Sequence, residues 1–338
     1  MNFITYCKRE IQVAALGTVV LLSACQSSGL PPQPGAVRPF DGAKLAPAVR
    51  GTPLPTNFGL ARKPGNFSPR AGQEYLYIAD QSNNSIDIFP LKGQNQPQVG
   101  TITTGIDFAY GLWFDRRDQS LYVANQLNST VTVYSHGSIQ PARTYSQGLS
   151  RPLYPIVDRH GELYVGNANN GTVTEYLDGS TSVYQVLQTP GVEVDGIALD
   201  KQENLYVAYR TGSVGTGSIE EFAPGSTQGT VIGMTLDQPQ GVVVDTSGNV
   251  VATETGSTNR IDLFPPGSKT ASLEIPMPSS SVATQLAIEC TEEKLFVSGL
   301  YSGIVFGVNY PLPNQSLFVK DQVSAIIQGV TMGLTPNF

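Results

Sequence analysis

Short runs in which apolar and polar residues alternate recur along most of the chain. The run at Leu121–Tyr134 has the sequence LYVANQLNSTVTVY, in which Val131 and Val133 alternate with polar-edged neighbours. An alternation with a period of two is typical of a β-strand. Asn128 and Ser129, between the two halves, are residues that favour a tight turn. The stretch therefore predicts a β-hairpin.

The same hairpin pattern occurs six times. Successive copies are 42 or 45 residues apart, and they begin at Leu76, Leu121, Leu163, Leu205, Val250 and Leu295. A period of about 40–50 residues in an all-β sequence is typical of the blades of a β-propeller.

A second apolar run precedes five of the hairpins and ends in an acidic residue. These acids are Asp115, Asp158, Asp200, Asp245 and Glu289. We expect them to cap the turn that follows, because Asp side chains bond the backbone of such turns. A turn rich in Pro and Gly and a fourth strand follow each hairpin. The chain is therefore predicted to be all-β, with six four-stranded blades forming a six-bladed β-propeller over residues 73–338.

The repeated strings resemble the NHL and YVTN families of propeller repeats. The matching residues are LYVAN-x-x-x-STVTVY from Leu121 and DGIALD-x-x-x-NLYVA from Asp195, and the resemblance extends from about Tyr75 to the C-terminus. It implies the propeller fold. It implies little about function, because the same fold serves both enzymes and interaction scaffolds.

The first hairpin, at Leu76, has no innermost strand before it. The C-terminal sequence IQGVTM at Ile327–Met332 matches PQGVVV at Pro239–Val244, which precedes another hairpin. We therefore expect the C-terminal run to be the innermost strand of the first blade. Both ends of the domain would then share one sheet, and hydrogen bonds would close the ring.

Composition narrows the range of partners. Of the 338 residues only 14% are charged, the net charge is −7, and 35 Gly and 24 Pro suit a protein with many turns. Nucleic-acid binding needs a basic surface for phosphate contacts, so no nucleic-acid partner is expected. The length fits one propeller with an N-terminal extension, and we expect a monomer.

The N-terminus has the pattern of an export signal. Lys8 and Arg9 precede an apolar run, Ile11–Leu22, that is short for a membrane span. The sequence LSAC that ends at Cys25 resembles the bacterial lipobox, which implies a lipoprotein signal peptide at residues 1–24 and acyl chains on Cys25. The alternative is an ordinary cleaved signal with a chance cysteine.

The segment that follows predicts a flexible tether over residues 25–72, because it is rich in Pro, Gly, Ser and Ala and has no sustained period. The expected location is the bacterial cell envelope, anchored to a membrane through Cys25. Gln26, where Asp would mark retention in the inner membrane, favours the outer membrane by analogy with enterobacterial sorting.

The positions of the loops assign residues to two faces of a propeller. Loops that lead into innermost strands, and turns between second and third strands, form the upper face; the other turns form the lower face. His136, His160 and Cys290 are predicted on the lower face. Histidine is the commonest general base, so its absence from the upper face counts against His-dependent catalysis there.

One string suggests an enzyme. Val194-Asp195-Gly196 looks like a motif of the gluconolactonase and senescence-marker propellers, in which such an acid holds a divalent metal at the central tunnel. The equivalent positions in the other blades hold no acid; they are Tyr110, Tyr154, Gln240, Thr284 and Gln328. A hard cation usually needs more than one carboxylate. We therefore expect no metal and no cofactor, with Asp195 as the only metal candidate.

Aromatic, basic and acidic side chains are predicted together on the upper face. The proposed ligand-binding residues are Tyr110, Arg151, Tyr154, Asp195, Tyr209 and Gln240. Asp107, Glu193, Arg210 and Glu254 are expected nearby. Such a mixture suits a protein, peptide or glycan, so we expect a binding or scaffold module. The alternative is a lactonase-like hydrolase or lyase with Asp195 at the central tunnel. Truncation of Arg151 or Tyr154 is expected to weaken binding with little effect on folding.

Overall fold

The computed structural model describes residues 73–212, 216–234, 236–289, 291–310, 317–323 and 327–334. The predicted signal peptide, the tether, the lipidation site at Cys25 and also Cys290 lie outside the described residues. No helix in the described part of the chain is long and apolar enough to cross a membrane.

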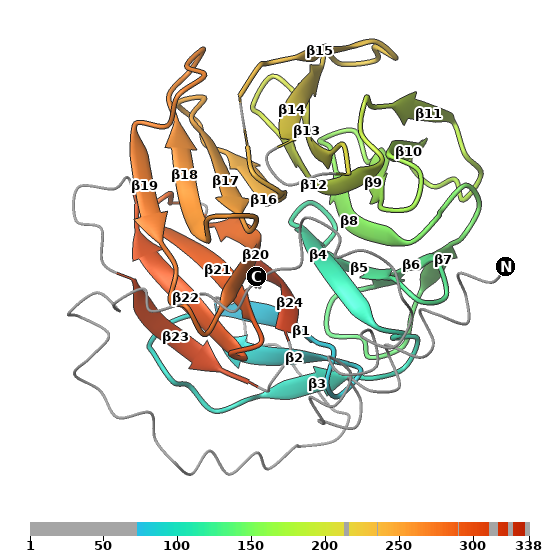
Figure 1. Cartoon of the computed structure of the whole chain (residues 1–338). Coiled ribbons are helices and arrows are strands. Elements are labelled where there is room, and N and C mark those ends of the chain that lie inside the picture. Colours follow the sequence, from blue (N-terminus) through green and yellow to red (C-terminus); the bar gives the residue numbers. More distant parts are fainter. Residues whose placement is uncertain are drawn as a thin grey trace, which may run out of the picture. The chain divides into compact units, whose positions relative to one another are not determined.

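The described residues form six four-stranded antiparallel sheets arranged in a ring around a central axis (Figure 1). This confirms the predicted six-bladed β-propeller. The innermost strand of each blade lies beside the innermost strands of its neighbours.

Each blade begins with an innermost strand at the axis and ends with an outermost strand at the rim of the ring. Blade 1 contains β24 (Ile327–Leu334), β1 (Glu74–Asp80), β2 (Ser85–Pro90) and β3 (Gly100–Ile102). Blade 2 contains β4 (Ala109–Asp115), β5 (Ser120–Asn125), β6 (Thr130–Tyr134) and β7 (Arg143–Tyr145). Blade 3 contains β8 (Pro152–Val157), β9 (Leu163–Asn167), β10 (Thr172–Tyr176) and β11 (Gln185–Gln188). Blade 4 contains β12 (Glu193–Leu199), β13 (Leu205–Arg210), β14 (Gly217–Phe222) and β15 (Gly229–Val231). Blade 5 contains β16 (Pro239–Val244), β17 (Val250–Glu254), β18 (Arg260–Phe264) and β19 (Leu273–Pro276). Blade 6 contains β20 (Val282–Ile288), β21 (Lys294–Leu300), β22 (Ile304–Asn309) and β23 (Phe318–Gln322).

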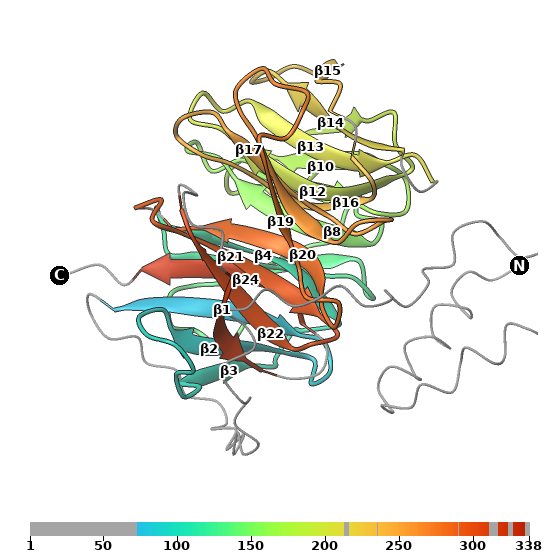
Figure 2. The ribbon, with the colours of Figure 1, turned by 60° about the vertical axis from the view of Figure 1, so that its left-hand side comes forward.

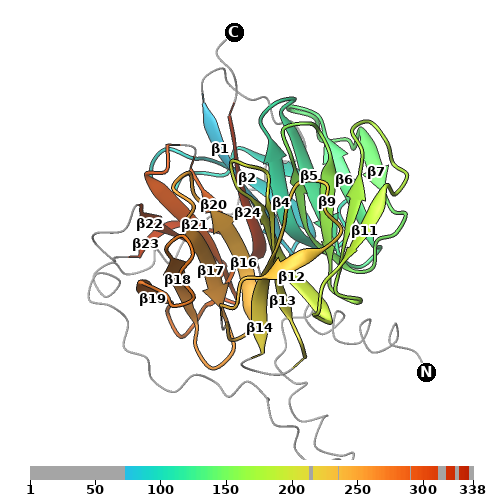
Figure 3. The same ribbon diagram turned by 90° about the horizontal axis from the view of Figure 1, so that it is seen from above.

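The C-terminal strand closes the ring, as predicted. Strand β24 pairs with β1 along its length, with Tyr77 opposite Thr331 and Ile78 opposite Val330. The two strands run side by side although they lie at opposite ends of the domain sequence (Figures 2 and 3). Blade 1 is therefore built from both ends of the domain.

The core lies between adjacent blades. Between blades 2 and 3, for example, buried Tyr122, Val131 and Val165 pack together, and the rings of Tyr145 and Tyr176 meet edge to face at 4.8 Å. These are the alternate residues of the repeated hairpins. The period of two thus places one apolar row of each sheet against the next sheet.

Every innermost strand carries a one-residue irregularity near its beginning. Such a bulge bends a strand and re-aims its side chains. The register shifts fall between Ala109 and Leu112, Pro152 and Tyr154, Val194 and Gly196, Pro239 and Val242, Ala283 and Leu286, and, for β24, opposite Ile78 and Asp80.

Glycines at these bulges let the innermost strands approach one another closely. A Cβ added at Gly241 would lie 2.5 Å from the carbonyl oxygen of Thr284, and one added at Gly196 would lie 2.7 Å from the carbonyl oxygen of Gln240. Both distances are too short for a carbon–oxygen contact. Gly196 and Gly241 are thus required at these positions, because any side chain there would collide with the backbone of the next blade.

The acids that end the innermost strands cap the turns of the lower face, as predicted. Oδ1 of Asp158 accepts from the backbone N–H groups of His160 and Glu162, at 2.9 and 2.8 Å. Asp200 and Asp245 accept two backbone N–H groups each in the same way, and Asp115 accepts one. Glu289 differs, because its side chain accepts from the Thr291 hydroxyl.

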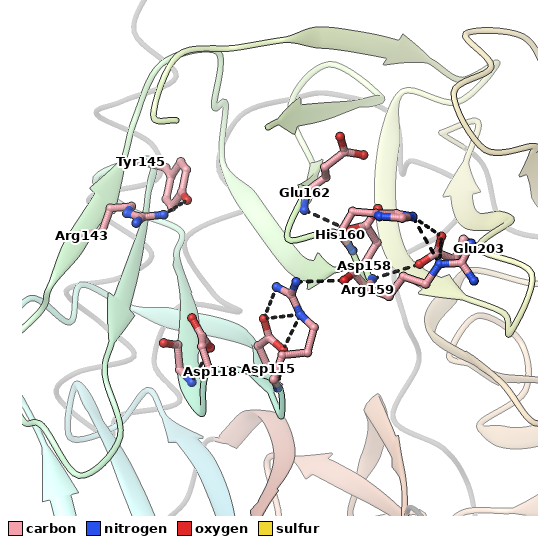
Figure 4. Close-up of polar contacts among 11 residues, drawn as sticks. Asp115, Asp118, Arg143, Tyr145, Asp158, Arg159, His160, Glu162 and Glu203 are labelled. Atoms are coloured by element: carbon pink, nitrogen blue, oxygen red, sulfur yellow. Dashed lines mark hydrogen bonds and ion pairs between the residues drawn. The ribbon is translucent and has the colours of Figure 1, made fainter. Parts of the chain in front are cut away.

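Polar contacts link successive turns on the lower face. Arg117 Nη1 donates to the Arg159 carbonyl, and the Arg159 N–H donates to Glu203, both at 3.0 Å. The side chains of Arg159 and His160 both point toward Glu203 (Figure 4). His160 is exposed and held by this surface contact, so its position agrees with the predicted lower face.

Candidate functional site

Backbone hydrogen bonds confirm which loops form the upper face. The turn after the second strand bonds to the loop that enters the same blade, through Gln126 N–H to Phe108 O, Ala168 N–H to Arg151 O, and Thr255 N–H to Gln238 O. The three accepting residues have left-handed backbones, with φ of 58°, 56° and 57°. A non-glycine residue in this region is strained, and here one stands at the entrance to blades 2, 3 and 5.

Four of the charged residues expected on this face form one cluster at the start of β12. Arg210 binds both oxygens of Asp195, with Nε to Oδ2 at 2.7 Å and Nη2 to Oδ1 at 2.9 Å. Its Nη2 also lies 2.7 Å from Glu193, and Arg151 lies 3.9 Å from the other oxygen of Glu193. The paired arrangement occupies both oxygens of Asp195 and leaves the Arg151 side chain 40% exposed.

Burial dominates the electrostatics of the cluster. The Asp195 side chain is 1% exposed. Loss of hydration raises the pKa of Asp195 to about 8, and the attraction of Arg210 opposes that rise. The two hydrogen bonds between Arg210 and the buried Asp195 make Asp195 a structural anchor for Arg210 at the bulge of β12.

Three of the predicted ligand-binding residues, Tyr110, Tyr154 and Gln240, contact one another near the axis of the ring. The Tyr110 hydroxyl donates to Gln240 Oε1 at 3.0 Å, which joins blade 2 to blade 5 across the axis. The Tyr110 and Tyr154 rings meet edge to face at 5.6 Å. Both tyrosines are buried, so these three predicted site residues fill the centre of the ring and do not form an open surface.

The predicted ligand-binding residue Tyr209 and the expected neighbour Glu254 lie elsewhere. Tyr209 is 4% exposed, and its ring packs against Gly191 between blades 3 and 4. Glu254 is also buried; it pairs with Arg260 at 3.1 Å and accepts from the backbone N–H of Asp237. Neither is part of the Asp195 cluster.

The expectation that Tyr154 can be truncated without affecting the fold is wrong. Tyr154 is 3% exposed and belongs to the core that joins blades 2, 3 and 4. Removal of such a ring costs about 3–5 kcal/mol. Arg151 is therefore the only one of the two that can be truncated as a clean test of binding.

Two exposed apolar residues that sequence reasoning did not single out are chain neighbours of residues that contact Arg151. Leu127 and Val192 are 38% and 54% exposed. Leu127 follows Gln126, whose side-chain oxygen accepts from the Arg151 guanidinium at 3.1 and 3.3 Å when the Gln126 amide is turned over. Val192 directly precedes Glu193. We call Leu127, Arg151, Val192 and Glu193 the Arg151 patch. The alternation of loops could place them on this face, but their exposure depends on tertiary packing.

The described residues provide no set of side chains suited to bind a metal ion. No group of three or more His, Cys, Asp or Glu in the described ranges is arranged to hold a metal ion. Asp195, the metal candidate, has both oxygens bound by Arg210. Carboxylates that ligate a hard cation need oxygens directed at the ion.

Comparisons with known proteins identify the architecture. No model of a known protein family matches the sequence, and no curated protein matches it. A chain from a crystal structure of a nidogen/laminin complex is similar, with a TM-score of 0.65 and 16% identity over 78% of this chain and 99% of that chain. Selenomethionine-substituted virginiamycin B lyase from Staphylococcus aureus is also similar, with a TM-score of 0.54 and 12% identity over 77% of this chain and 88% of that chain. At these identities the likeness extends to the fold alone: the chain is a six-bladed β-propeller.

Proposed function

We propose that this protein is a lipid-anchored β-propeller of the bacterial cell envelope, built from repeats of the NHL and YVTN type. Its upper face binds a protein partner through the Arg151 patch. The lipobox-like sequence that ends at Cys25 supports the anchor. A similar propeller-containing structure is a complex between two proteins, which supports a protein as the partner.

The composition of the Arg151 patch is the observation that carries the proposal. The Arg151 side chain is 40% exposed, and the exposed apolar residues Leu127 and Val192 are the chain neighbours of its polar contacts Gln126 and Glu193. Glu193 lies 3.9 Å from the guanidinium, and Gln126 accepts from it when the Gln126 amide oxygen is turned toward Arg151, so the guanidinium has polar neighbours on this face. Arginine is enriched among the few residues that contribute most of the binding free energy of an interface.

A crosslinking experiment tests the binding face. A photoreactive amino acid at position 192 should give one discrete adduct in intact cells, and the adduct should disappear in an Arg151→Ala background. Once the partner is purified, Arg151→Ala should weaken binding by about thirtyfold, since an interface arginine commonly contributes about 2 kcal/mol. Arg159→Ala, on the lower face, is the matched control and should change neither result.

The proposal fails if position 192 gives no discrete adduct. It also fails if the adduct persists with Arg151→Ala, because the arginine would then not contribute to the interface. An adduct obtained equally from the exposed edge residue Tyr184 would indicate collision with abundant neighbours and would contradict a specific upper-face site.

Lipidation is tested separately. Cys25→Ser should move the protein from the membrane fraction to the soluble envelope fraction, since two or more acyl chains anchor a protein stably at about 0.8 kcal/mol per buried methylene. Fractionation and incorporation of labelled palmitate are the measurements. Cys7→Ser is the control, and it should leave anchoring unchanged. Retention of the Cys25→Ser protein in membranes would place the anchor elsewhere.

A further inference from the structure

The innermost strands enclose two adjoining pockets at the axis of the ring. The smaller has a volume of about 110 Å³ and the larger about 300 Å³. The charged residues that line the larger pocket are Arg116, Glu289 and Glu292, which belong to the turns that follow β4 and β20. Those turns are on the lower face, so the larger pocket extends to that face. We call the two pockets together the axial pocket.

The walls of the axial pocket are apolar and keep some contact with solvent. The half-buried apolar residues in the lining come from β4, β12, β16 and β20, and they are Trp113, Leu199, Val243, Val244 and Ile288. Gln285 also lines both pockets, but its amide is used within the protein, where its oxygen accepts from the N–H groups of Leu112 and Val330. The walls therefore suit the apolar body of a ligand.

The two glutamates of the lining differ in accessibility. Glu289 is buried, whereas Glu292 is half-buried. The two oxygens of Glu292 accept from Thr246 in the preceding blade, one from its N–H and the other from its hydroxyl, at 2.7 Å each. A carboxylate oxygen can accept more than one hydrogen bond, so Glu292 can still accept from a ligand.

Arg116 also lines the larger pocket, and it is exposed. Among the described residues it is the one arginine whose guanidinium has no hydrogen bond or ion pair. The others bind a carboxylate or a tyrosine hydroxyl, and they are Arg117, Arg143, Arg151, Arg159, Arg210 and Arg260. The fork of N–H donors on a guanidinium matches the two oxygens of a carboxylate. Arg116 is therefore available to an acidic group of a ligand.

We propose that the axial pocket binds a small zwitterion with an apolar body, of the size of an apolar amino acid. The carboxylate of the ligand pairs with Arg116, its ammonium group pairs with Glu292, and its apolar body contacts the walls. Since the lining has charges of both signs and Arg116 has no partner of its own, a molecule with both charges complements it better than an acid or an amine alone. A cavity of about 150 Å³ holds a six-carbon ring, so the larger pocket has room for an amino acid. This site lies on the opposite face from the Arg151 patch and is independent of the proposed protein partner.

The single tryptophan of the chain lines both pockets and reports binding. L-Leucine is the probe, and its titration should change the tryptophan fluorescence saturably. Three analogues each lack one feature: 4-methylpentanoate lacks the ammonium group, 3-methylbutylamine lacks the carboxylate, and glycine lacks the apolar body. We expect leucine to bind at least about fivefold more tightly than each analogue, because each loses one charged hydrogen bond or the buried apolar area.

Two variants test the assigned pairs one charge at a time. Arg116→Gln should weaken leucine binding about tenfold and leave the binding of 3-methylbutylamine unchanged or tighter, because the amine has no group that pairs with Arg116. Glu292→Gln should weaken leucine binding by about the same factor and leave the binding of 4-methylpentanoate unchanged or tighter. Retained binding of the analogue shows in each case that the pocket is still folded.

The matched controls remove the same charges outside the pocket. They are Lys92→Gln on the lower face and Glu293→Gln beside Glu292, at exposed residues that line neither pocket, and both should leave leucine binding unchanged. The proposal is overturned if leucine causes no saturable change, if an analogue binds as tightly as leucine, or if either pocket variant binds leucine unchanged. An equal loss in Lys92→Gln or Glu293→Gln would indicate an effect of net surface charge and would also contradict a site at the axis.

Discussion

A chain that ends at Gln322 is expected not to form the closed ring. The truncation removes β24, which pairs with β1 and holds the fully buried Ile327 and Val330. Burial of two such side chains contributes about 3–6 kcal/mol, and the loss also exposes the edge of β1. Since whole domains are stable by about 5–15 kcal/mol, we expect loss of the cooperative thermal transition, with aggregation or rapid proteolysis.

A chain that ends at Leu334 is the matched control for this truncation. It keeps all of β24 and should retain the melting temperature of the full chain. Circular dichroism on heating and limited proteolysis are the measurements. If the chain that ends at Gln322 melted cooperatively at the same temperature as the control, β24 would not be needed to close the ring.

Lys320→Met is expected to cost about 3–5 kcal/mol of unfolding free energy. The side chains of Lys320 and Asp321 on β23 are 2% and 1% exposed. Lys320 Nζ lies 2.5 Å from Asp321 Oδ2. They join blade 6 to blade 1, because Lys320 also donates to Pro90 O and Asp321 accepts from the Gln96 N–H. Removal of the lysine leaves a buried carboxylate without its counter-charge, which is far costlier than removal of both charges.

The double variant Lys320→Met/Asp321→Asn tests this reason. It removes both charges, and its Asn oxygen can still accept from the Gln96 N–H. Denaturant unfolding should show the double variant recovering at least half of the stability lost in Lys320→Met. If the single and double variants were equally unstable, the loss would arise from packing and not from an uncompensated charge.

The closure of the ring could be predicted from the sequence because short sequence patterns identify the strands of each blade. The hairpin period identifies the blades, and the match between residues 327–332 and 239–244 identifies the missing innermost strand. The same holds for the turn-capping acids such as Asp158, since a capping carboxylate and its N–H partners lie within four residues of each other. Such features depend on neighbours in the chain.

From the sequence, the candidate site could be predicted only to lie on the upper face of the propeller. Loop alternation placed Arg151, Tyr154 and Asp195 on the correct end of the ring, because it depends on strand order alone. It could not show that Asp195 binds Arg210 through both oxygens, or that Tyr154 lies in the core. Bulges near the start of the innermost strands interrupt the period of two beside Asp195 and Tyr154, so the alternation of the sequence does not predict where these side chains lie.

The sequence by itself thus determined the number of blades, the strand order, the closure of blade 1 and the face on which each loop lies. Only the tertiary structure decided which of those residues are exposed. Leu127 and Val192 are exposed, while Trp113 and Tyr154, from different blades, pack in one hydrophobic core. Exposure, and contacts across the axis, depend on how the six separate sheets pack around it. A local sequence period carries no information about the distances between residues of different sheets.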